Sequence, residues 1–326
     1  MKLIQWPDTD AYFNLAAEEF IFEHMDSGEE YLLLWQNRNA IVVGVHQNTW
    51  EEINQQFVDE NSIQVVRRLT GGGAVYHDLG NLNYSIVTDH NGSDFDFQAL
   101  AQPVVRTLKK MGGNVEFNGR NDLTMEGRKI SGSAQMIRSG RVLHHGTLLF
   151  NSDIDRISHA LNVKGDKIES KGIKSVRSRV TNIQEHIPHA TIDTFRTTLL
   201  DEIRFENHLS EYVFTADDRA AISKLRQEKY STWEWNFGRS PDYEIKKERR
   251  FAQGGVSIYM TIRKGIIQSI RIFGDFFGNG ELRELEECLL SVECREETVR
   301  NALAAFDIPS YIHGMSLDEL VKTITS

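Results

Sequence analysis

Apolar and polar residues alternate along the chain with two periods, which predict a mixture of strands and helices. Tyr31 to Trp35 and Ala40 to Val45 are short apolar runs, and the polar turn between them predicts a hairpin. From Ala11 to Met25, apolar residues recur every three or four positions, as on the buried face of a helix. Further strands are expected at Lys2 to Trp6, Ile63 to Val66 and Leu82 to Val87, and further helices at Thr49 to Asn61, Phe95 to Met111, Asp153 to Leu161, Thr191 to Phe205 and Ala216 to Lys229.

The order of these elements indicates two domains of the α+β class. Strands and helices follow one another without regular alternation, which disfavours a doubly wound parallel sheet. The aromatic segment from Tyr230 to Pro241 ends in a glycine and a proline, which interrupt regular secondary structure, and we expect it to mark the edge of a domain. Beyond it, three apolar runs between Lys246 and Phe273 predict a meander, and three helices follow. We therefore expect a large mixed domain over residues 1–243 and a small α+β domain over residues 244–326.

Composition argues against two broad classes of protein. The formal net charge of -10 at pH 7 disfavours a general nucleic-acid binder, which needs a broad basic surface. No apolar stretch approaches the ~20 residues that span a membrane, and Met1 to Trp6 leads directly into polar residues. We therefore expect a cytoplasmic protein that binds neither nucleic acid nor membrane. Few features suggest an obligate interface, so we expect a monomer.

A glycine triplet is the first candidate for chemistry. Arg67 and Arg68 end a predicted strand, and Gly71 to Gly73 follow two residues later. Without Cβ atoms, glycines let backbone N–H groups converge on a phosphate or carboxylate, and an arginine adds positive charge. The spacing matches neither a P-loop nor a dinucleotide fingerprint, and a flexible turn is the alternative. Because neighbours on a strand face opposite sides, we expect one arginine to serve the site and the other to be solvated.

Two later segments offer further polar groups. Asn121 and Asp122 suit a purine edge, a ribose or Mg²⁺, although their spacing alone favours an Asx turn. Lys129 lies among small residues and could stabilise a phosphoryl or acyl oxygen, with a surface lysine as the alternative. His144 and His145 are adjacent on a predicted strand and cannot share one metal, so zinc is not expected. One of these histidines could face the site, and a core histidine is the alternative.

Six motifs together resemble the lipoate-protein ligase A family, nearly from end to end of the chain. These motifs are Arg67 to Asp78, Gly119 to Asp122, Arg128 to Ala134, His144 to Leu149, Lys171 to Val180 and Trp233 to Gly238. The resemblance implies a large catalytic domain of the biotin/lipoate ligase type and a small C-terminal accessory domain. Thr70 stands where a close relative would carry serine, which is a mild departure.

The resemblance also implies roles for individual residues. Lys129 falls where the family contacts both the nucleotide and lipoate, and we expect it to be the catalytic residue. ATP is expected at Arg68, Gly73, Ala74, Val75, Tyr76, Asn121, Asp122 and Lys129. Lipoate is expected at Arg68, Gly71, Gly72, Lys129 and His145. An adenylate-binding loop is expected around Lys174, Ser175, Val176 and Arg177, and Asp122 is the expected ligand of Mg²⁺.

The expected reaction joins (R)-lipoate, with octanoate as an alternative substrate, to a lysine of a lipoyl domain through lipoyl-AMP. Acceptors would be the H protein of glycine cleavage or E2 subunits of 2-oxoacid dehydrogenases. A rival acyltransferase would need a thiolate near Lys129. The only cysteines, Cys288 and Cys294, lie in the small domain, on what we expect to be one helical stretch. A biotin ligase and a non-catalytic lipoate binder are further rivals of the ligase interpretation.

Overall fold

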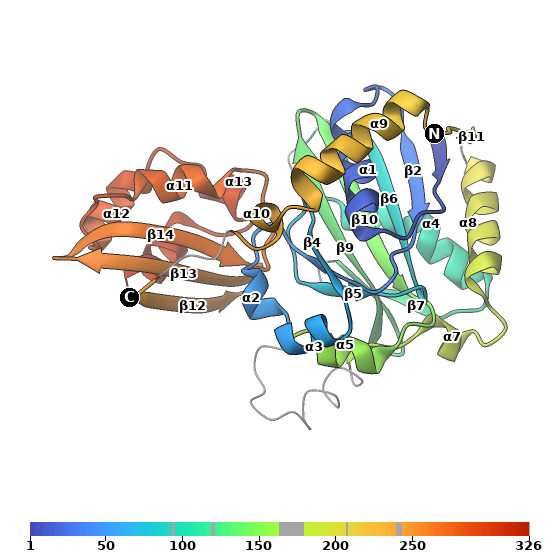
Figure 1. The fold of residues 1–326 in the computed structure, drawn as a ribbon, viewed down its shortest axis with the longest axis horizontal. Helices are drawn as coiled ribbons and strands as arrows, with labels where there is room; N and C mark the ends of the chain where they lie inside the picture. Colours follow the sequence, from blue (N-terminus) through green and yellow to red (C-terminus); the bar gives the residue numbers. More distant parts are fainter. Residues whose placement is uncertain are drawn as a thin grey trace.

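The computed structural model describes residues 1–90, 92, 95–118, 121–162, 179–206, 208–238 and 243–325. Figure 1 shows a larger domain, which carries the N-terminus, beside a smaller C-terminal one. Both combine sheets with helices, which confirms the α+β prediction and the small C-terminal domain. A division between residues 243 and 244 stays our proposal. Within the part of the chain described, no helix is long and apolar enough to cross a membrane.

An eight-stranded sheet forms the centre of the larger domain, in the order β11-β1-β2-β6-β10-β9-β8-β7. β1 pairs in parallel with β2 and β11, whereas the remaining neighbours are antiparallel. The strands are β1 (Lys2–Gln5), β2 (Tyr31–Trp35), β6 (Asn81–Asp89), β7 (Val115–Asn118), β8 (Asp122–Met125), β9 (Arg128–Arg138), β10 (Arg141–Leu149) and β11 (Ser210–Glu211).

Helices cover both faces of this sheet. Leu33 of β2 packs in one buried cluster with α1 (Ala11–His24) and α9 (Ala216–Leu225). Leu32 and Leu34 belong to a second cluster with α4 (Phe97–Lys110) and α8 (Ile192–Glu206). Because both of its faces are covered, β2 is apolar at every position rather than alternating. Further helical segments of this domain are α7 (Ile183–His186), the π-helical turn η1 (Arg226–Tyr230) and α10 (Trp233–Asn236).

The predicted hairpin of Tyr31–Trp35 with Ala40–Val45 is wrong. The second run forms β3 (Ala40–Val43), which belongs to a separate sheet of order β4-β3-β5. There it pairs in parallel with β4 (Gln64–Arg67) and antiparallel with β5 (Val75–His77). A short polar turn connects the two sheets instead of folding one strand back on the other, and local sequence alone does not distinguish these outcomes. This second sheet places the glycine triplet between β4 and β5.

The single helix expected from Thr49 to Asn61 is two short helices. They are α2 (Thr49–Glu52), with Asn48 as its N-cap, and α3 (Gln55–Glu60). The hydroxyl of Thr49 donates to the carbonyl of Asn236 and accepts from Arg67. Nearby, α5 (Ile154–Ala160) forms where the sequence predicts a helix.

In the smaller domain, four helices pack on a three-stranded meander. The apolar pattern predicts the meander and three of these helices, and it misses the short helix α13. Its elements are β12 (Ile245–Phe251), β13 (Gly254–Arg263), β14 (Ile266–Gly274), α11 (Leu282–Cys288), α12 (Glu296–Leu303), α13 (Ile308–Tyr311) and α14 (Leu317–Thr325). Cys288 ends α11 and Cys294 lies beyond it, so the prediction of one helical stretch is wrong. Both thiols are unpaired and pack against the core of this domain.

Candidate active site

A pocket of about 110 Å³ lies in the larger domain between the glycine triplet and strands β6, β9 and β10. The sheet brings several lining residues into one row, since Trp35 pairs with Asn83 and Asn83 pairs with Thr147. Thr147 in turn contacts the backbone of Gly132 through its hydroxyl. The full lining is Leu15, Trp35, Val42, Arg68, Gly72, Gly73, Ala74, Val75, His77, Asn83, Asn121, Lys129, Gly132, Ser133, Ala134, His145, Gly146 and Thr147.

Both arginines before the glycine triplet are buried, so the prediction that one is solvated is wrong. Arg67 is 1% exposed and Arg68 is 5% exposed. Arg68 lines the pocket, whereas Arg67 lies on the other side of β4. The Arg67 guanidinium donates to the carbonyl groups of Gly44, Val45, Gln47, Trp235 and Asn236 and to the hydroxyl of Thr49. These bonds replace water, and Arg67 therefore has a structural role.

Arg68 holds the conformation of the glycine triplet through hydrogen bonds to its carbonyl groups. Its Nη2 donates to the carbonyl oxygens of Gly71 at 2.6 Å and Gly73 at 2.9 Å, and its Nε donates to Thr70 Oγ1 at 2.9 Å. Burial lowers the pKa of Arg68 to about 10, and the Glu18 carboxylate acts in the opposite direction. Arg68 therefore stays charged at neutral pH while it fixes the carbonyl groups of the triplet.

The small domain touches the glycine triplet directly. The amide of Gly72 donates to the carbonyl oxygen of Phe276 at 3.2 Å, and the ring of Phe277, which is fully buried, packs on Gly72. A Cβ atom on Gly71 would lie 2.2 Å from the Phe276 oxygen. The triplet thus allows the close approach of a second domain as well as that of a ligand.

Gly71→Ala should weaken this contact between the domains, because the added methyl group cannot fit without moving Phe276. We expect a destabilisation of about 1–3 kcal/mol and a larger radius of gyration in small-angle scattering. Gly73→Ala is the matched control, since a Cβ atom there meets nothing within 4 Å and its backbone is not left-handed. An unchanged radius of gyration in Gly71→Ala would contradict the expectation.

The side chain of Lys129, on β9, lines the pocket and contacts Asp122, which belongs to the predicted polar pair Asn121 and Asp122. Its Nζ lies 2.8 Å from Oδ1 of Asp122, and both side chains are partly exposed. Gly132 leaves room for it, because a Cβ atom there would lie 2.7 Å from Nζ. Asn121 lines the pocket beside them and donates to the Ser133 carbonyl at 2.6 Å. A cation, a carboxylate and an amide therefore lie at one wall of the pocket.

Of the adjacent histidines His144 and His145, His145 faces the pocket. Its Nε2 lies 2.8 Å from Thr70 Oγ1, and its Nδ1 lies 2.9 Å from a carboxylate oxygen of Glu18 on α1. His144 is fully buried on the other face of β10, where burial and the neighbouring His145 lower its pKa to about 3. The opposite orientation expected for adjacent strand residues is thus present. Among the described residues, no cluster of three or more His, Cys, Asp or Glu side chains could hold a metal.

Most of the predicted site residues come together in this pocket. Arg68, Gly72 to Val75, Asn121, Lys129 and His145 line it, with Asp122 bound to Lys129. Gly71 contributes its carbonyl to Arg68. The side chain of Tyr76 instead packs in the core beside β3 and donates to Asn39, so only its backbone could serve a ligand. Lys174, Ser175, Val176 and Arg177 lie outside the described residues.

Sequence reasoning missed several residues of the site or its support, among them Trp35, His77, Asn83 and Glu18. Trp35 and Asn83 belong to strands predicted only as core, and nothing in their spacing separates them from other strand residues. Glu18 is 2% exposed within the apolar stripe of α1. A carboxylate at a core position of a helix needs a buried partner, and that conflict was the available signal.

Comparisons with known proteins show the family of this chain. Residues 10–204 match the family model for the lipoyl protein ligase A/B catalytic domain, and residues 240–324 match that for the bacterial lipoate protein ligase C-terminus. The lipoate-protein ligase LplJ of Bacillus subtilis is 42% identical over 320 residues, which cover 97% of each chain.

Two solved structures are similar to this fold. The structure of P. falciparum LipL1 in complex with lipoate has a TM-score of 0.81 at 22% identity and covers 98% of both chains. A lipoate-protein ligase A bound with ATP has a TM-score of 0.63 at 29% identity and covers 73% of this chain and 98% of its own. From the two domain models and the B. subtilis relative, we conclude that this chain belongs to the family of lipoate-protein ligases.

Proposed function

We propose that this protein activates lipoate with ATP and transfers the lipoyl group to a lysine of an acceptor protein. The observation that carries the proposal is the joint presence of Lys129, the Arg68-supported glycine triplet and an apolar wall in one pocket. The ammonium of Lys129 suits phosphate and carboxylate oxygens. Leu15, Trp35 and Val42 suit an acyl chain.

The proposed reaction has two steps. A carboxylate oxygen of lipoate attacks the α-phosphorus of ATP, pyrophosphate leaves, and a mixed anhydride, lipoyl-AMP, forms. The ε-amine of the acceptor lysine then attacks the acyl carbon, and AMP leaves with the electron pair of the broken C–O bond. Lys129 stabilises the negative charge that develops on the phosphoryl and carbonyl oxygens. No protein nucleophile takes part.

The position of the thiols supports an adenylate over a thioester intermediate. Cys288 and Cys294 are the only cysteines of the chain, and both pack against the core of the small domain. Burial raises the pKa of the Cys288 thiol, which disfavours the thiolate. Neither cysteine lines the pocket that holds Lys129.

Asp122 is the residue that we propose as a ligand of Mg²⁺. Its carboxylate is a hard oxygen donor beside the pocket, and Mg²⁺ commonly uses one or two carboxylates together with substrate phosphates. The ion would neutralise phosphate charge. Asp122 also holds the ammonium of Lys129, which orients this lysine at the wall of the pocket.

The proposal also covers the acceptor protein, the acyl substrate and the location of the enzyme. The H protein of glycine cleavage and E2 subunits of 2-oxoacid dehydrogenases are the proposed acceptors, and octanoate is an alternative acyl substrate. An adenylate-binding role for Lys174, Ser175, Val176 and Arg177, a cytoplasmic location and a monomeric state stay predictions.

Lipoate-dependent exchange of labelled pyrophosphate into ATP tests the first step. We expect exchange that requires lipoate and Mg²⁺, and we expect mass spectrometry to find one lipoyl group on a purified acceptor domain after the second step. Tight binding of lipoate without exchange would contradict the ligase proposal and favour a non-catalytic binder.

A further inference from the structure

A chain of buried hydrogen bonds connects α1 to the glycine triplet. Trp35 Nε1 donates to Ser85 Oγ at 2.8 Å, and Ser85 Oγ donates to Glu18 Oε1 at 2.6 Å. The same oxygen lies 2.9 Å from Nδ1 of His145, whose Nε2 lies 2.8 Å from Thr70 Oγ1. Thr70 accepts from Arg68 Nε at 2.9 Å. Glu18, Ser85 and Thr70 are 2%, 1% and 0% exposed, so water does not compete for these bonds.

One form of His145 satisfies both ends of this chain. The Glu18 oxygen can only accept, so the proton that it binds must be on Nδ1 of the imidazole. At the other end, Arg68 Nε can only donate, so Thr70 Oγ1 is its acceptor, and the threonine hydroxyl finds its own acceptor in Nε2 when that nitrogen carries no proton. The neutral imidazole with its proton on Nδ1 is therefore the form in which every donor has an acceptor.

The far end of the chain shapes the pocket itself. Arg68 continues from Thr70 to the carbonyl oxygens of Gly71 and Gly73. Burial lowers the pKa of Arg68, and the negative charge of Glu18 acts in the opposite direction. His145 and Thr70 connect the two side chains. Removal of the Glu18 charge would thus act on the tautomer of His145 and on the guanidinium that holds the triplet.

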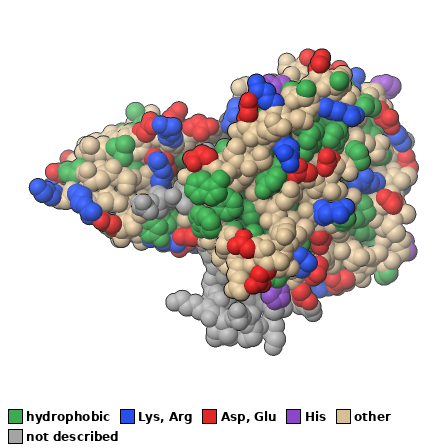
Figure 2. Space-filling model, in the orientation of Figure 1, with side chains coloured by type: hydrophobic (Ala, Val, Ile, Leu, Met, Phe, Trp, Pro, Cys, Tyr) green, Lys and Arg blue, Asp and Glu red, His purple; other side chains and the backbone are tan. Residues whose placement is uncertain are grey.

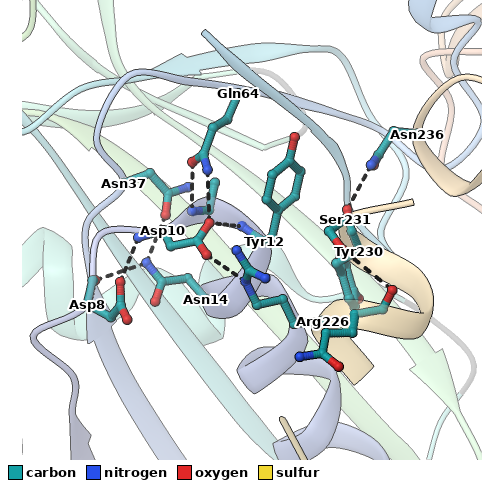
Figure 3. A network of polar contacts seen from close by, with 12 residues as sticks. Asp8, Asp10, Tyr12, Asn14, Asn37, Gln64, Arg226, Tyr230, Ser231 and Asn236 are labelled. Carbon is teal, nitrogen blue, oxygen red and sulfur yellow. Dashed lines mark hydrogen bonds and ion pairs between the residues drawn. The ribbon is translucent and has the colours of Figure 1, made fainter. Parts of the chain in front are cut away.

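The helix that carries Glu18 is itself held in place. Figure 3 shows the polar contacts at its N-terminal end, where Asp10 caps the helix and binds both Gln64 of β4 and Arg226 of η1. Asn14, one turn further along, donates to Asn37 at 2.9 Å. These contacts fix α1 against the strand that ends in Arg67, so Glu18 has a defined position relative to the triplet.

We propose that Glu18 is a positioning residue of this site: it fixes the Nδ1–H tautomer of His145 and, through Thr70 and Arg68, the carbonyl groups of Gly71 and Gly73. The effect on catalysis rests on the proposed function, whereas the effect on His145 does not. Glu18 itself does not line the pocket. An amide in place of the carboxylate could donate to Nδ1, which would move the imidazole proton to Nε2 and leave the Thr70 hydroxyl without its acceptor.

The test combines ¹⁵N NMR of the His145 imidazole in the full chain with the kinetics of lipoate-dependent exchange. We expect a protonated Nδ1 in the wild type and a protonated Nε2 in Glu18→Gln. We expect kcat/KM for lipoate to fall up to about 100-fold in Glu18→Gln, the scale on which small misplacements act. Thr70→Val should show a similar fall, and Thr70→Ser, which keeps the hydroxyl, should stay within about threefold of the wild type.

Controls separate a positioning role from a loss of fold. Glu19→Gln changes the neighbouring carboxylate, which binds Lys229 and Tyr230 instead, and should alter neither the His145 tautomer nor the exchange kinetics. Because one network links the two sites, Glu18→Gln with Thr70→Val should be no worse than the poorer single variant. If Glu18→Gln does not fold, the comparison of Thr70→Val with Thr70→Ser decides.

Two outcomes would overturn the proposal. One is a wild-type His145 that carries its proton on Nε2, and the other is unaltered exchange kinetics in a folded Glu18→Gln or Thr70→Val variant. A wild-type protein without any exchange would instead contradict the proposed function, and the NMR result would still decide whether Glu18 sets the tautomer.

Discussion

Lys129→Ala should lower lipoate-dependent exchange of pyrophosphate into ATP by about 100- to 1,000-fold, the usual effect of removing one preorganised donor from a site where charge develops. The Lys129 ammonium lies at the pocket wall, held by Asp122 at 2.8 Å. Its side chain is 37% exposed, so its removal should change the melting temperature little. Exchange kinetics and thermal denaturation of the same preparation measure both effects.

Lys110→Ala is the matched control for this variant. Lys110 also pairs with a carboxylate, Glu202 at 3.5 Å, but on the surface of α4 and away from the pocket lining. We expect full exchange activity in Lys110→Ala. Full activity in Lys129→Ala would remove this lysine from the mechanism.

Arg67→Met should have the largest effect on stability, about 3 kcal/mol or more, because it leaves several buried carbonyl groups without a donor. In a domain of this size, such a loss corresponds to a fall of roughly 6–12 °C in melting temperature. Arg67 joins β4 to the loop before α2 and to α10 by bonds of 2.7 to 3.2 Å. Thermal denaturation followed by circular dichroism measures the change.

Arg38→Met provides the comparison, since Arg38 lies in the same domain and is exposed. We expect its effect to stay within about 0.5 kcal/mol, as for most surface substitutions. Similar melting temperatures for the two variants would mean that the Arg67 network contributes little to stability.

The apolar pattern predicts most helices and strands of this fold because each element buries a face whose period is local. Which strands pair with one another does not follow from such a local pattern. β2 and β3 are both fully buried runs on either side of a short polar turn, yet they belong to different sheets. Their partners β6 and β4 come from later parts of the chain, so no local pattern could assign them.

Residue types whose chemistry is visible in sequence predict the glycine triplet and Lys129 as candidates for an anion site, whereas their roles toward ATP and lipoate are implied by the resemblance to the ligase family. The environment of Arg67 and the partner of Glu18 were not predicted, because both depend on contacts between distant segments. Arg67 binds a segment 168 to 169 residues away. Glu18 meets His145 across 127 residues. A buried charge is compatible with folding only when such partners exist, and sequence shows the charge without the partner.

Hydrophobic side chains gather on the surface near α2 and α10, at the junction of the two domains (Figure 2). Trp50 and Trp233 are 42% and 62% exposed, and both rings pack on Phe237, which follows α10. Arg67 also binds α10 through the carbonyl groups of Trp235 and Asn236. These bonds hold the end of the larger domain in place just before the chain continues to the small domain.

The contact of Phe276 and Phe277 with the glycine triplet can hold the two domains together even if its intrinsic affinity is low. Because both domains belong to one chain, the second domain is present at an effective concentration of the order of millimolar. A contact with millimolar affinity is therefore occupied about half of the time within the chain, and one tenfold stronger is occupied most of the time. Between separate chains at micromolar concentration, the same contact would be almost entirely dissociated.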